Sequence, residues 1–180
     1  VERFRDFTTI SGIQYIEVDQ PVYPQMDSAR VATRVDSVHG GYGLPLPYTG
    51  KDVVVGIIDA GYDYTHPSLY DTAYNTYRVK RVWEEKNTSG TPPAGFNYGT
   101  EYADSASIHA KQYDVNDGTH GAHVAGIAAG SGYGGDTDPA RYRGVAYNSE
   151  MVLVAIYPAL EYWLSTGMAD MLDGASYVFN

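Results

Sequence analysis

The amino-acid sequence predicts an α/β domain built around a mainly parallel sheet. Residues 53–58 and 151–156 are short, unbroken apolar runs, which are typical of strands buried on both faces. Residues 120–130 and 168–179 carry small or apolar side chains at helical spacing. Strands that alternate with helices favour a parallel sheet covered by helices. The 180 residues, 43% of them hydrophobic, are enough for one sizeable domain with its own core.

The remaining elements of the domain are less sharply marked. Residues 78–83 are a weaker strand candidate, and residues 87–117, rich in Gly, Pro, Ser and Tyr, are expected to be mostly irregular. Glycines inside the helix at 120–130 lower its stability, so they indicate that another backbone segment approaches it closely. Ser165 or Thr166 is the expected cap of the last helix.

The first fifty residues are divided by a linker at 20–24, where two prolines interrupt the chain. A strand candidate at 14–18 precedes this linker. A helix capped by Asp27 and running to Val38 follows it. Residues 1–22 are therefore expected to form a separate N-terminal segment, and residues 23–180 the domain.

Composition excludes several classes of function. The chain has 22 acidic and 12 basic residues, a net charge of −10, and no cluster of Lys and Arg, which argues against nucleic-acid binding. It has no cysteine, which excludes disulfides, thiolate zinc sites and a thiol nucleophile. No apolar run approaches the ~20 residues that a membrane span requires, and no signal peptide is present.

Asp59 directly follows the apolar run at 53–58, at the carboxyl end of a predicted central strand. In open α/β sheets, ligands and catalysis are found at this end of the strands. A carboxylate that emerges from a buried strand needs a strong hydrogen-bond donor. This segment alone leaves two interpretations open: a catalytic carboxylate, or a structural one bonded to loop amides, with Gly61 making the turn.

His120 lies in the first turn of the predicted helix at 120–130, behind Thr119 as its expected cap. The positive end of the helix dipole disfavours an imidazolium at this position. A buried carboxylate beside the ring would restore its basicity and fix its tautomer. Without Asp59, a histidine bonded to backbone at a helix start would be the preferred interpretation.

The two segments together resemble a known family. Residues 53–69 read Val-Val-Val-Gly-Ile-Ile-Asp-Ala-Gly-Tyr-Asp-Tyr-Thr-His-Pro-Ser-Leu, and residues 117–130 read Asp-Gly-Thr-His-Gly-Ala-His-Val-Ala-Gly-Ile-Ala-Ala-Gly. Both resemble the aspartate and histidine motifs of the subtilisin-like serine peptidases, the subtilases, in the family's order of Asp, His and Ser. The likeness extends from Tyr48 to the end of the chain. It implies a doubly wound sheet with helices on both faces, here the N-terminal part of a catalytic domain.

The resemblance also implies roles for individual residues. Asp59 would orient the imidazole, and His120 would act as general base and then general acid, with a hydrogen bond of about 2.6–3.2 Å between them. Asp117 would lie near substrate residues that precede the cleaved bond, with a weak preference for basic side chains. Three further positions are expected to be structural, a loop-fixing acid and two histidines: Asp63, His66 and His123.

Several positions depart from the family pattern. Ala60 and Ala122 replace the usual hydroxyl residues, and Tyr147 replaces a frequent Pro; none of these changes removes a catalytic group. Ser68 stands where many relatives have a calcium-binding Asp, so a calcium site is not assigned and no cofactor is expected for the chemistry. No Gly-Thr-Ser nucleophile segment or oxyanion Asn is recognisable after His120. Ser131, Ser165 and Ser176, which follow His120, are not expected to be nucleophiles.

Two other classes of function stay open at this stage. The first is a metal site formed by a cluster of acids and histidines, namely Asp59, Asp63, His66, His120 and His123, although the pattern is not His-Glu-x-x-His. The second is a catalytically dead binding module, which the 18 tyrosines of the chain would suit.

The family resemblance carries three more expectations. Residues 1–22 would be the tail of a propeptide or an N-terminal extension, and the protein would be secreted, periplasmic or at the cell surface. The partner would be a peptide or protein substrate. Because the next strand of the family sheet is expected to pair with Met151–Ile156, that strand should present an unpaired edge through which the chain self-associates.

Overall fold

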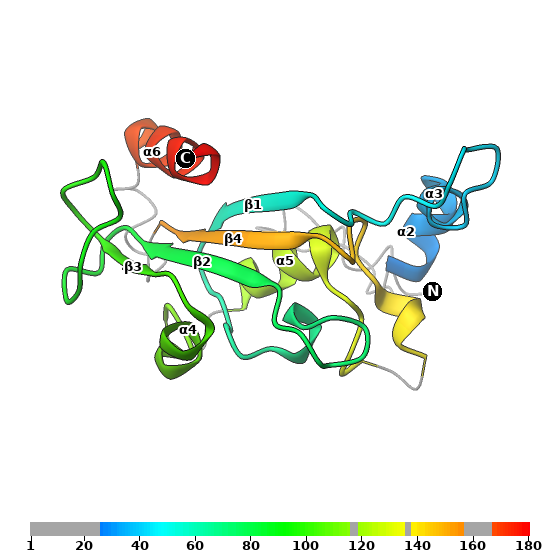
Figure 1. Cartoon of the computed structure of the whole chain (residues 1–180), viewed down its shortest axis with the longest axis horizontal. Helices are drawn as coiled ribbons and strands as arrows, with labels where there is room; N and C mark the ends of the chain where they lie inside the picture. The colour runs from blue at the N-terminus through cyan, green and yellow to red at the C-terminus, as the bar shows by residue number, and fades with distance from the viewer. Residues whose placement is uncertain (1–25, 116–118, 136–137, 157–166) are drawn as a thin grey trace, which may run out of the picture.

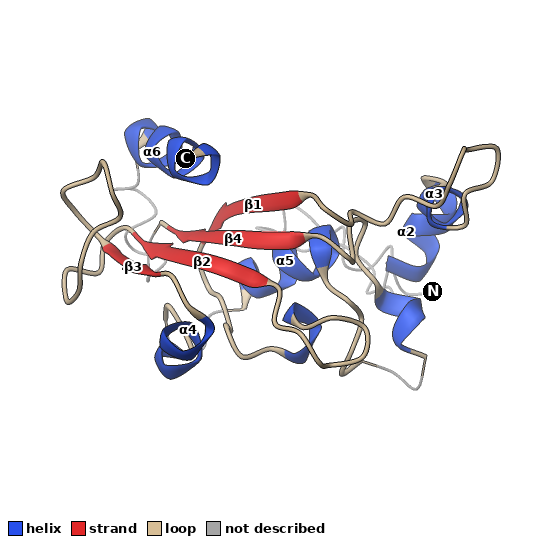
Figure 2. Ribbon diagram, in the orientation of Figure 1, coloured by secondary structure: helices blue, strands red, loops and turns tan. Residues whose placement is uncertain are grey.

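The computed structural model describes residues 26–115, 119–135, 138–156 and 167–180, and a four-stranded sheet organises them (Figures 1 and 2). The strands are β1 (Val54–Asp59), β2 (Val79–Glu84), β3 (Thr100–Tyr102) and β4 (Glu150–Ala155). Their order is β1-β4-β2-β3. Strands β1, β4 and β2 are parallel, and the short β3 is antiparallel to β2. The predicted α/β class with a mainly parallel sheet is confirmed.

Helices cover both faces of this sheet (Figure 1). Helix α5 (His120–Ala129) and helix α4 (Ser105–Lys111) lie on one face, and helix α6 (Met168–Phe179) lies on the other. Successive side chains of a strand point to opposite faces. Accordingly Met151 and Leu153 of β4 join the core on the α5 side, and Val152 and Val154 join the core on the α6 side. The doubly wound arrangement therefore follows from the alternation along β4.

The prediction of an unpaired edge along Met151–Ile156 is wrong. Strand β4 is the inner strand: Leu153 pairs with Ile57 of β1 on one side and with Val82 of β2 on the other. The nearly continuous apolar run takes the position where both edges and both faces are covered, as burial requires. Self-association through this strand therefore has no physical basis.

Strand β1 has a hydrogen-bonded neighbour on one side only among the described strands. It was expected to be buried on both faces, but Val54 is 50% exposed and burial is complete only toward its carboxyl end, at Ile57 and Asp59. Helix α6 crosses this strand so closely that a Cβ on Gly56 would lie 2.3 Å from Val178 Cγ1. Glycine at position 56 therefore sets how near α6 can come to the sheet.

The segment at 87–117 contains more regular structure than its composition indicates. Both β3 and α4 lie within it. Helix α4 begins after Asp104, whose side chain accepts the N–H of Ser107 at 2.9 Å as an N-cap. The predicted strand at 78–83 and the helix at 168–179 are confirmed, but the last helix begins after Gly167, with Asp170 accepting its N–H. Ser165 and Thr166 lie outside the described residues.

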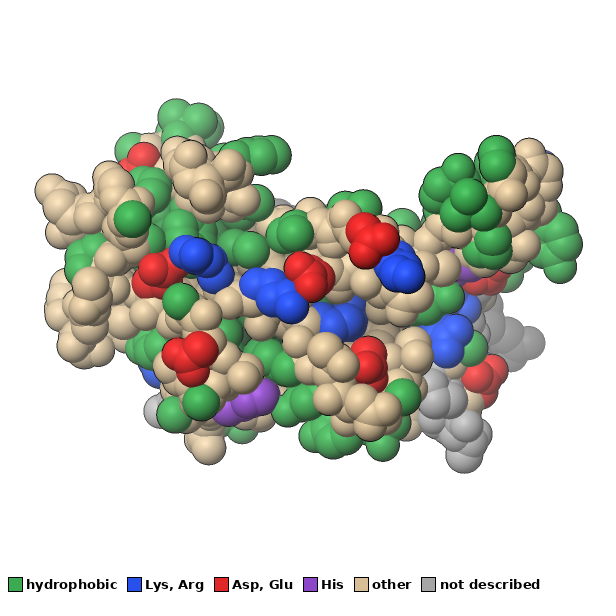
Figure 3. Space-filling model, viewed as in Figure 1, with side chains coloured by type: hydrophobic (Ala, Val, Ile, Leu, Met, Phe, Trp, Pro, Cys, Tyr) green, Lys and Arg blue, Asp and Glu red, His purple; other side chains and the backbone are tan. Residues whose placement is uncertain are grey.

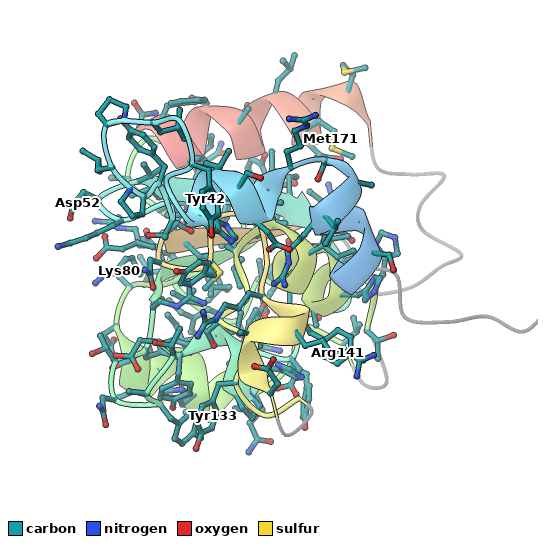
Figure 4. The ribbon with its side chains drawn as sticks, turned by 90° about the vertical axis from the view of Figure 1, so that its right-hand side faces the viewer. Tyr42, Asp52, Lys80, Tyr133, Arg141 and Met171 are labelled. Atoms are coloured by element: carbon teal, nitrogen blue, oxygen red, sulfur yellow. The ribbon has the colours of Figure 1, made fainter. Side chains whose placement is uncertain are left out.

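The single helix expected from Asp27 to Val38 is two short ones. Helix α2 (Met26–Ala32) already includes Asp27, and helix α3 (Val35–His39) follows after Arg34, which has a positive φ of 61°. Helix α2 lies beside the turn η2 (Pro139–Tyr142), the segment that carries Arg141 in Figure 4. Arg30 holds the two together by donating to the carbonyls of Ala140 at 2.6 Å and Arg143 at 3.0 Å.

Neither the strand at 14–18 nor the linker at 20–24 lies within the described residues. The boundary between residues 1–22 and 23–180 therefore stays a prediction. Because α2 packs on η2, the chain from Met26 onward is part of the domain.

The surface carries charges of both signs. Figure 3 shows Lys and Arg side chains next to Asp and Glu side chains across one face. Ion pairs among the described residues include Lys80–Glu150 and Arg81–Glu101. This face offers no field of one sign to a nucleic acid. Among the described residues no helix combines the length and the hydropathy needed to cross a bilayer.

Candidate active site

Asp59 and His120 meet at the carboxyl end of β1. Asp59 follows Ile57 by two residues and so points to the same face of the sheet, the one that α5 covers. Its Oδ1 lies 2.7 Å from His120 Nδ1, within the range expected from the sequence. The Asp59 side chain is 11% exposed, whereas that of His120 is 73% exposed. A shielded carboxylate thus holds an accessible imidazole.

Backbone hydrogen bonds place His120 beside Asp59. The first N–H groups of a helix lack partners within the helix. Here Gly121 N donates to the carbonyl of Ala60 at 2.8 Å, and Ala122 N donates to that of Gly61 at 2.9 Å. The side chain of Thr119, the expected cap, makes no capping bond, since the loop carbonyls satisfy these donors. The end of β1 and the start of α5 are therefore joined through the main chain.

The junction between β1 and α5 explains why residue 121 is a glycine. A Cβ on Gly121 would lie 2.9 Å from the ring of Tyr62 and 3.0 Å from the carbonyl oxygen of Ala60. The close backbone approach predicted from the glycines of this helix is thus present at its first turn. It recurs at the other end, where Gly144 N donates to Gly130 O at 2.8 Å.

Asp114 fixes the loop that follows Asp59. Its two carboxylate oxygens accept the N–H groups of Gly61 at 2.8 Å and Tyr62 at 2.6 Å. Burial raises the pKa of Asp114, and the three backbone N–H groups that it accepts oppose this rise. Sequence reasoning missed this residue, because it lies in a segment taken as irregular and its partners are more than fifty residues away.

Tyr62 is a buried residue close to the carboxylate of Asp59. Its ring is buried, and its hydroxyl donates to Ile57 O at 3.0 Å. Burial, followed by the nearby charges of Asp59 and Asp114, raises the pKa of this phenol well above its ordinary value. Tyr62 therefore remains a neutral donor that shields Asp59 from water.

The arrangement fixes the tautomer of His120. A carboxylate only accepts, so Nδ1 must donate its proton to Asp59. In the neutral ring the lone pair is then on Nε2, on the exposed side of the imidazole. Such a nitrogen can take a proton from a hydroxyl group and return it to a leaving group.

Of the other predicted positions, two have the structural role expected of them, one does not, and one lies outside the described residues. Asp63 fixes its loop, as expected, by accepting the N–H and the hydroxyl of Thr65 at 2.9 and 2.7 Å. His66 is structural, as expected, because its Nδ1 accepts the N–H of Ser68 at 3.2 Å. The side chain of His123 is exposed and makes no hydrogen bond to any described residue, so the structure gives this side chain no structural role. Asp117 lies outside the described residues.

Among the described residues, the structure gives the metal-site alternative no support. His120 pairs with Asp59, while Asp63 and His66 bond to their own loop. No group of three or more His, Asp or Glu side chains that could hold a metal ion occurs among the described residues. At Ser68 a cation is already present, since the buried guanidinium of Arg78 donates to its carbonyl at 2.9 Å. A calcium site at Ser68 therefore stays unassigned.

The described serines after His120 do not supply a nucleophile. Ser149, just before β4, is fully buried. Ser131 is fully buried, and its hydroxyl accepts the N–H of Tyr133 at 3.2 Å. It follows the far end of α5, roughly 16 Å from His120 at the rise of an α-helix. Ser176 belongs to α6, on the opposite face of the sheet, and Ser165 lies outside the described residues. Asp59 and His120 are thus two members of a site whose third member these residues do not provide.

Three comparisons with known proteins bear on this site. The family model described as the subtilase family matches residues 50–180. The PII-type proteinase of Lactococcus lactis subsp. cremoris is 29% identical over 171 residues, 91% of this chain but only 8% of that relative. Subtilisin-like protease SBT2.1 of Arabidopsis thaliana is 37% identical over 98 residues, 47% of this chain and 12% of that relative. The chain therefore spans about a tenth of the length of these relatives.

A solved structure agrees with them. The CspB protease of Clostridium perfringens superposes with a TM-score of 0.54 at 26% identity, over 85% of this chain and 31% of that one. The family model covers both β1 and α5, which carry the two motifs. Because the family model covers most of the chain, including Asp59 and His120, the chain belongs to the subtilase family of serine peptidases.

Proposed function

We propose that the protein to which this chain belongs is a serine endopeptidase in which Asp59 and His120 are two members of the catalytic triad. The observation that supports this most directly is the 2.7 Å contact between Asp59 Oδ1 and His120 Nδ1. The contact leaves Nε2 free on an exposed ring, which is the geometry a general base needs.

The proposed chemistry assigns each group one task. His120 Nε2 takes the proton of a serine hydroxyl as that oxygen attacks the peptide carbonyl, and then gives the proton to the departing amine. Asp59 keeps Nδ1 protonated and stabilises the imidazolium that forms in between. The serine and the oxyanion donor are not among the described residues. No cofactor is needed for these steps.

The proposed substrates are peptides or proteins, met outside the cytoplasm. Relatives are named as proteinases, and the family resemblance supports a secreted, periplasmic or cell-surface protein. Asp117 remains a proposed contact for a basic side chain of the substrate. Nothing in the Asp59–His120 pair favours the alternative of a catalytically dead binding module, since the pair is fully formed.

The chain of 180 residues alone should have no peptidase activity. Ser131 and Ser149 are buried and Ser176 lies in α6 on the opposite face of the sheet, so none of these described serines can form a covalent intermediate. The measurement is turnover of a fluorescent casein by the purified chain, together with labelling by a fluorophosphonate. The intact protein under the same conditions is the control. Turnover by the chain that the fluorophosphonate abolishes would mean that a serine dismissed above is the nucleophile.

A further inference from the structure

Glu85 is a buried acid that the proposed catalytic chemistry does not use. It directly follows β2, and its N–H donates to Ala155 O at 3.0 Å, at the same end of the sheet as Asp59. Its residue exposure is 1%, and neither carboxyl oxygen has a hydrogen-bond partner in the described structure. An ionised carboxylate in such a place is strongly disfavoured. The structure must therefore hold Glu85 as a neutral acid or release it to water.

The neighbouring Glu84 shows that burial does not by itself leave a glutamate without hydrogen-bond partners. Glu84 is almost as buried but is fully partnered, by Tyr64, Asn87 and Lys111. The two side chains point to opposite faces of the sheet, Glu84 toward the α5 side and Glu85, two residues after Trp83, toward α6. Glu85 is thus the unpartnered acid beneath α6.

The groups that face Glu85 are mostly acidic and already engaged. Asp170 of α6 accepts from Lys86 Nζ at 2.7 Å and from Gly167 N at 2.9 Å. Asp173 of α6 accepts from the hydroxyl of Tyr98 at 2.7 Å. Burial chiefly, then Asp170 and Asp173, raise the pKa of Glu85 to about 8, and Lys86 opposes them. A charge on Glu85 would be the third negative charge beside one ammonium group.

The two halves of α6 are held differently. Toward its end, Tyr177 packs on Trp83 with ring centroids 5.2 Å apart and donates to Glu101 at 2.8 Å. Its first two turns carry Asp170 and Asp173 over Glu85. Figure 4 shows Met171 on this first part of the helix. The first half is therefore the part that the charge of Glu85 would repel.

We propose that Glu85 is a proton-operated latch, which as a neutral acid lets the first half of α6 dock on the end of the sheet and as a carboxylate releases it. The direction follows from linkage. The docked state binds the proton more tightly than a released state in which Glu85 meets water, with a pKa of roughly 4.3. Docking is therefore fully favoured below that value and weakens as the pH rises toward 8.

Hydrogen exchange of the α6 amides tests the latch. In the chain as it stands, protection of residues 168–174, corrected for the intrinsic pH dependence of exchange, should fall about tenfold or more between pH 5 and pH 9. The Trp83–Tyr177 contact belongs to the half of α6 that stays docked, so protection of residues 175–179 should change less over the same range. Glu85→Gln and the apolar Glu85→Met should both keep α6 protected at pH 9.

A matched variant separates the latch from a general effect of pH. Glu101→Gln removes another acid that contacts α6, but one whose carboxylate is satisfied by Arg81 and Tyr177. It should retain the pH-dependent loss of protection. A loss of equal size in Glu85→Gln, or α6 protection that does not vary with pH in the unmodified chain, would overturn the proposal. Neither readout uses catalysis, so failure of the latch and failure of the proposed peptidase activity are distinguishable.

Discussion

In the intact protein, His120→Ala should lower kcat by about 10⁴-fold or more, as removal of a triad member does in subtilisin itself. The variant loses the imidazole that contacts Asp59, so the nucleophilic hydroxyl keeps its proton. The fold should survive, because the side chain is exposed and α5 is attached through its backbone. Hydrolysis of a fluorogenic peptide at saturating substrate, with thermal unfolding as a check, measures the effect.

His123→Ala is the matched control for that experiment. His123 lies one turn further along the same helix, and its exposed side chain has no hydrogen-bond partner among the described residues. Its loss should change kcat by no more than a few fold. If the two variants lost activity equally, the proposed role of His120 would have to be abandoned.

The largest effect on stability is expected at Arg78. This guanidinium is buried, at 5% exposure, and donates to four backbone carbonyls at 2.8–2.9 Å, those of Ser68, Tyr70, Ala129 and Ser149. Burial lowers its pKa to about 10, so it remains charged at neutral pH. It ties the loop after β1, the end of α5 and the start of β4 together.

Arg78→Ala would leave these carbonyls buried without a donor, and it should lower the free energy of unfolding by about 3–5 kcal/mol. Urea denaturation at pH 7 measures the loss. Arg81→Ala is the control: it removes an exposed ion pair with Glu101 from β2, the strand that follows Arg78, and should change the stability by less than about 1 kcal/mol. Equal losses in the two variants would mean that the four bonds of Arg78 contribute little.

The elements that local sequence patterns determine could be predicted from the sequence. The apolar runs gave two strands of the parallel sheet, and helical spacing gave α5 and α6 to within a residue. Asp59 and His120 were recognisable because each stands beside such an element, at a strand end and a helix start. Their pairing needed the family resemblance, since sixty-one residues separate them.

Features decided by distant partners could not be predicted. The order of the strands places β4 between β1 and β2, which no local pattern reveals. Helix α4 is short and depends on the cap from Asp104 as well as on packing. Asp114 and Arg78 look like ordinary charged residues, since their partners lie up to 71 positions away. Glu85 differs from Glu84 only in which face of the sheet it meets.

The main-chain junction between β1 and α5 makes the alignment of Asp59 and His120 tolerant of sequence drift. The groups that align the two residues are the carbonyls of Ala60 and Gly61 and the N–H groups of Gly121 and Ala122, which every residue except Pro can supply. Ala60 and Ala122 can therefore replace the hydroxyl residues usual in the family at no loss to this alignment. Two positions are restricted: position 121, because it has no room for a side chain, and position 61, because its φ of 84° favours glycine. Substitutions around the pair should then accumulate nearly neutrally, and divergence at these positions says little about whether a relative is active.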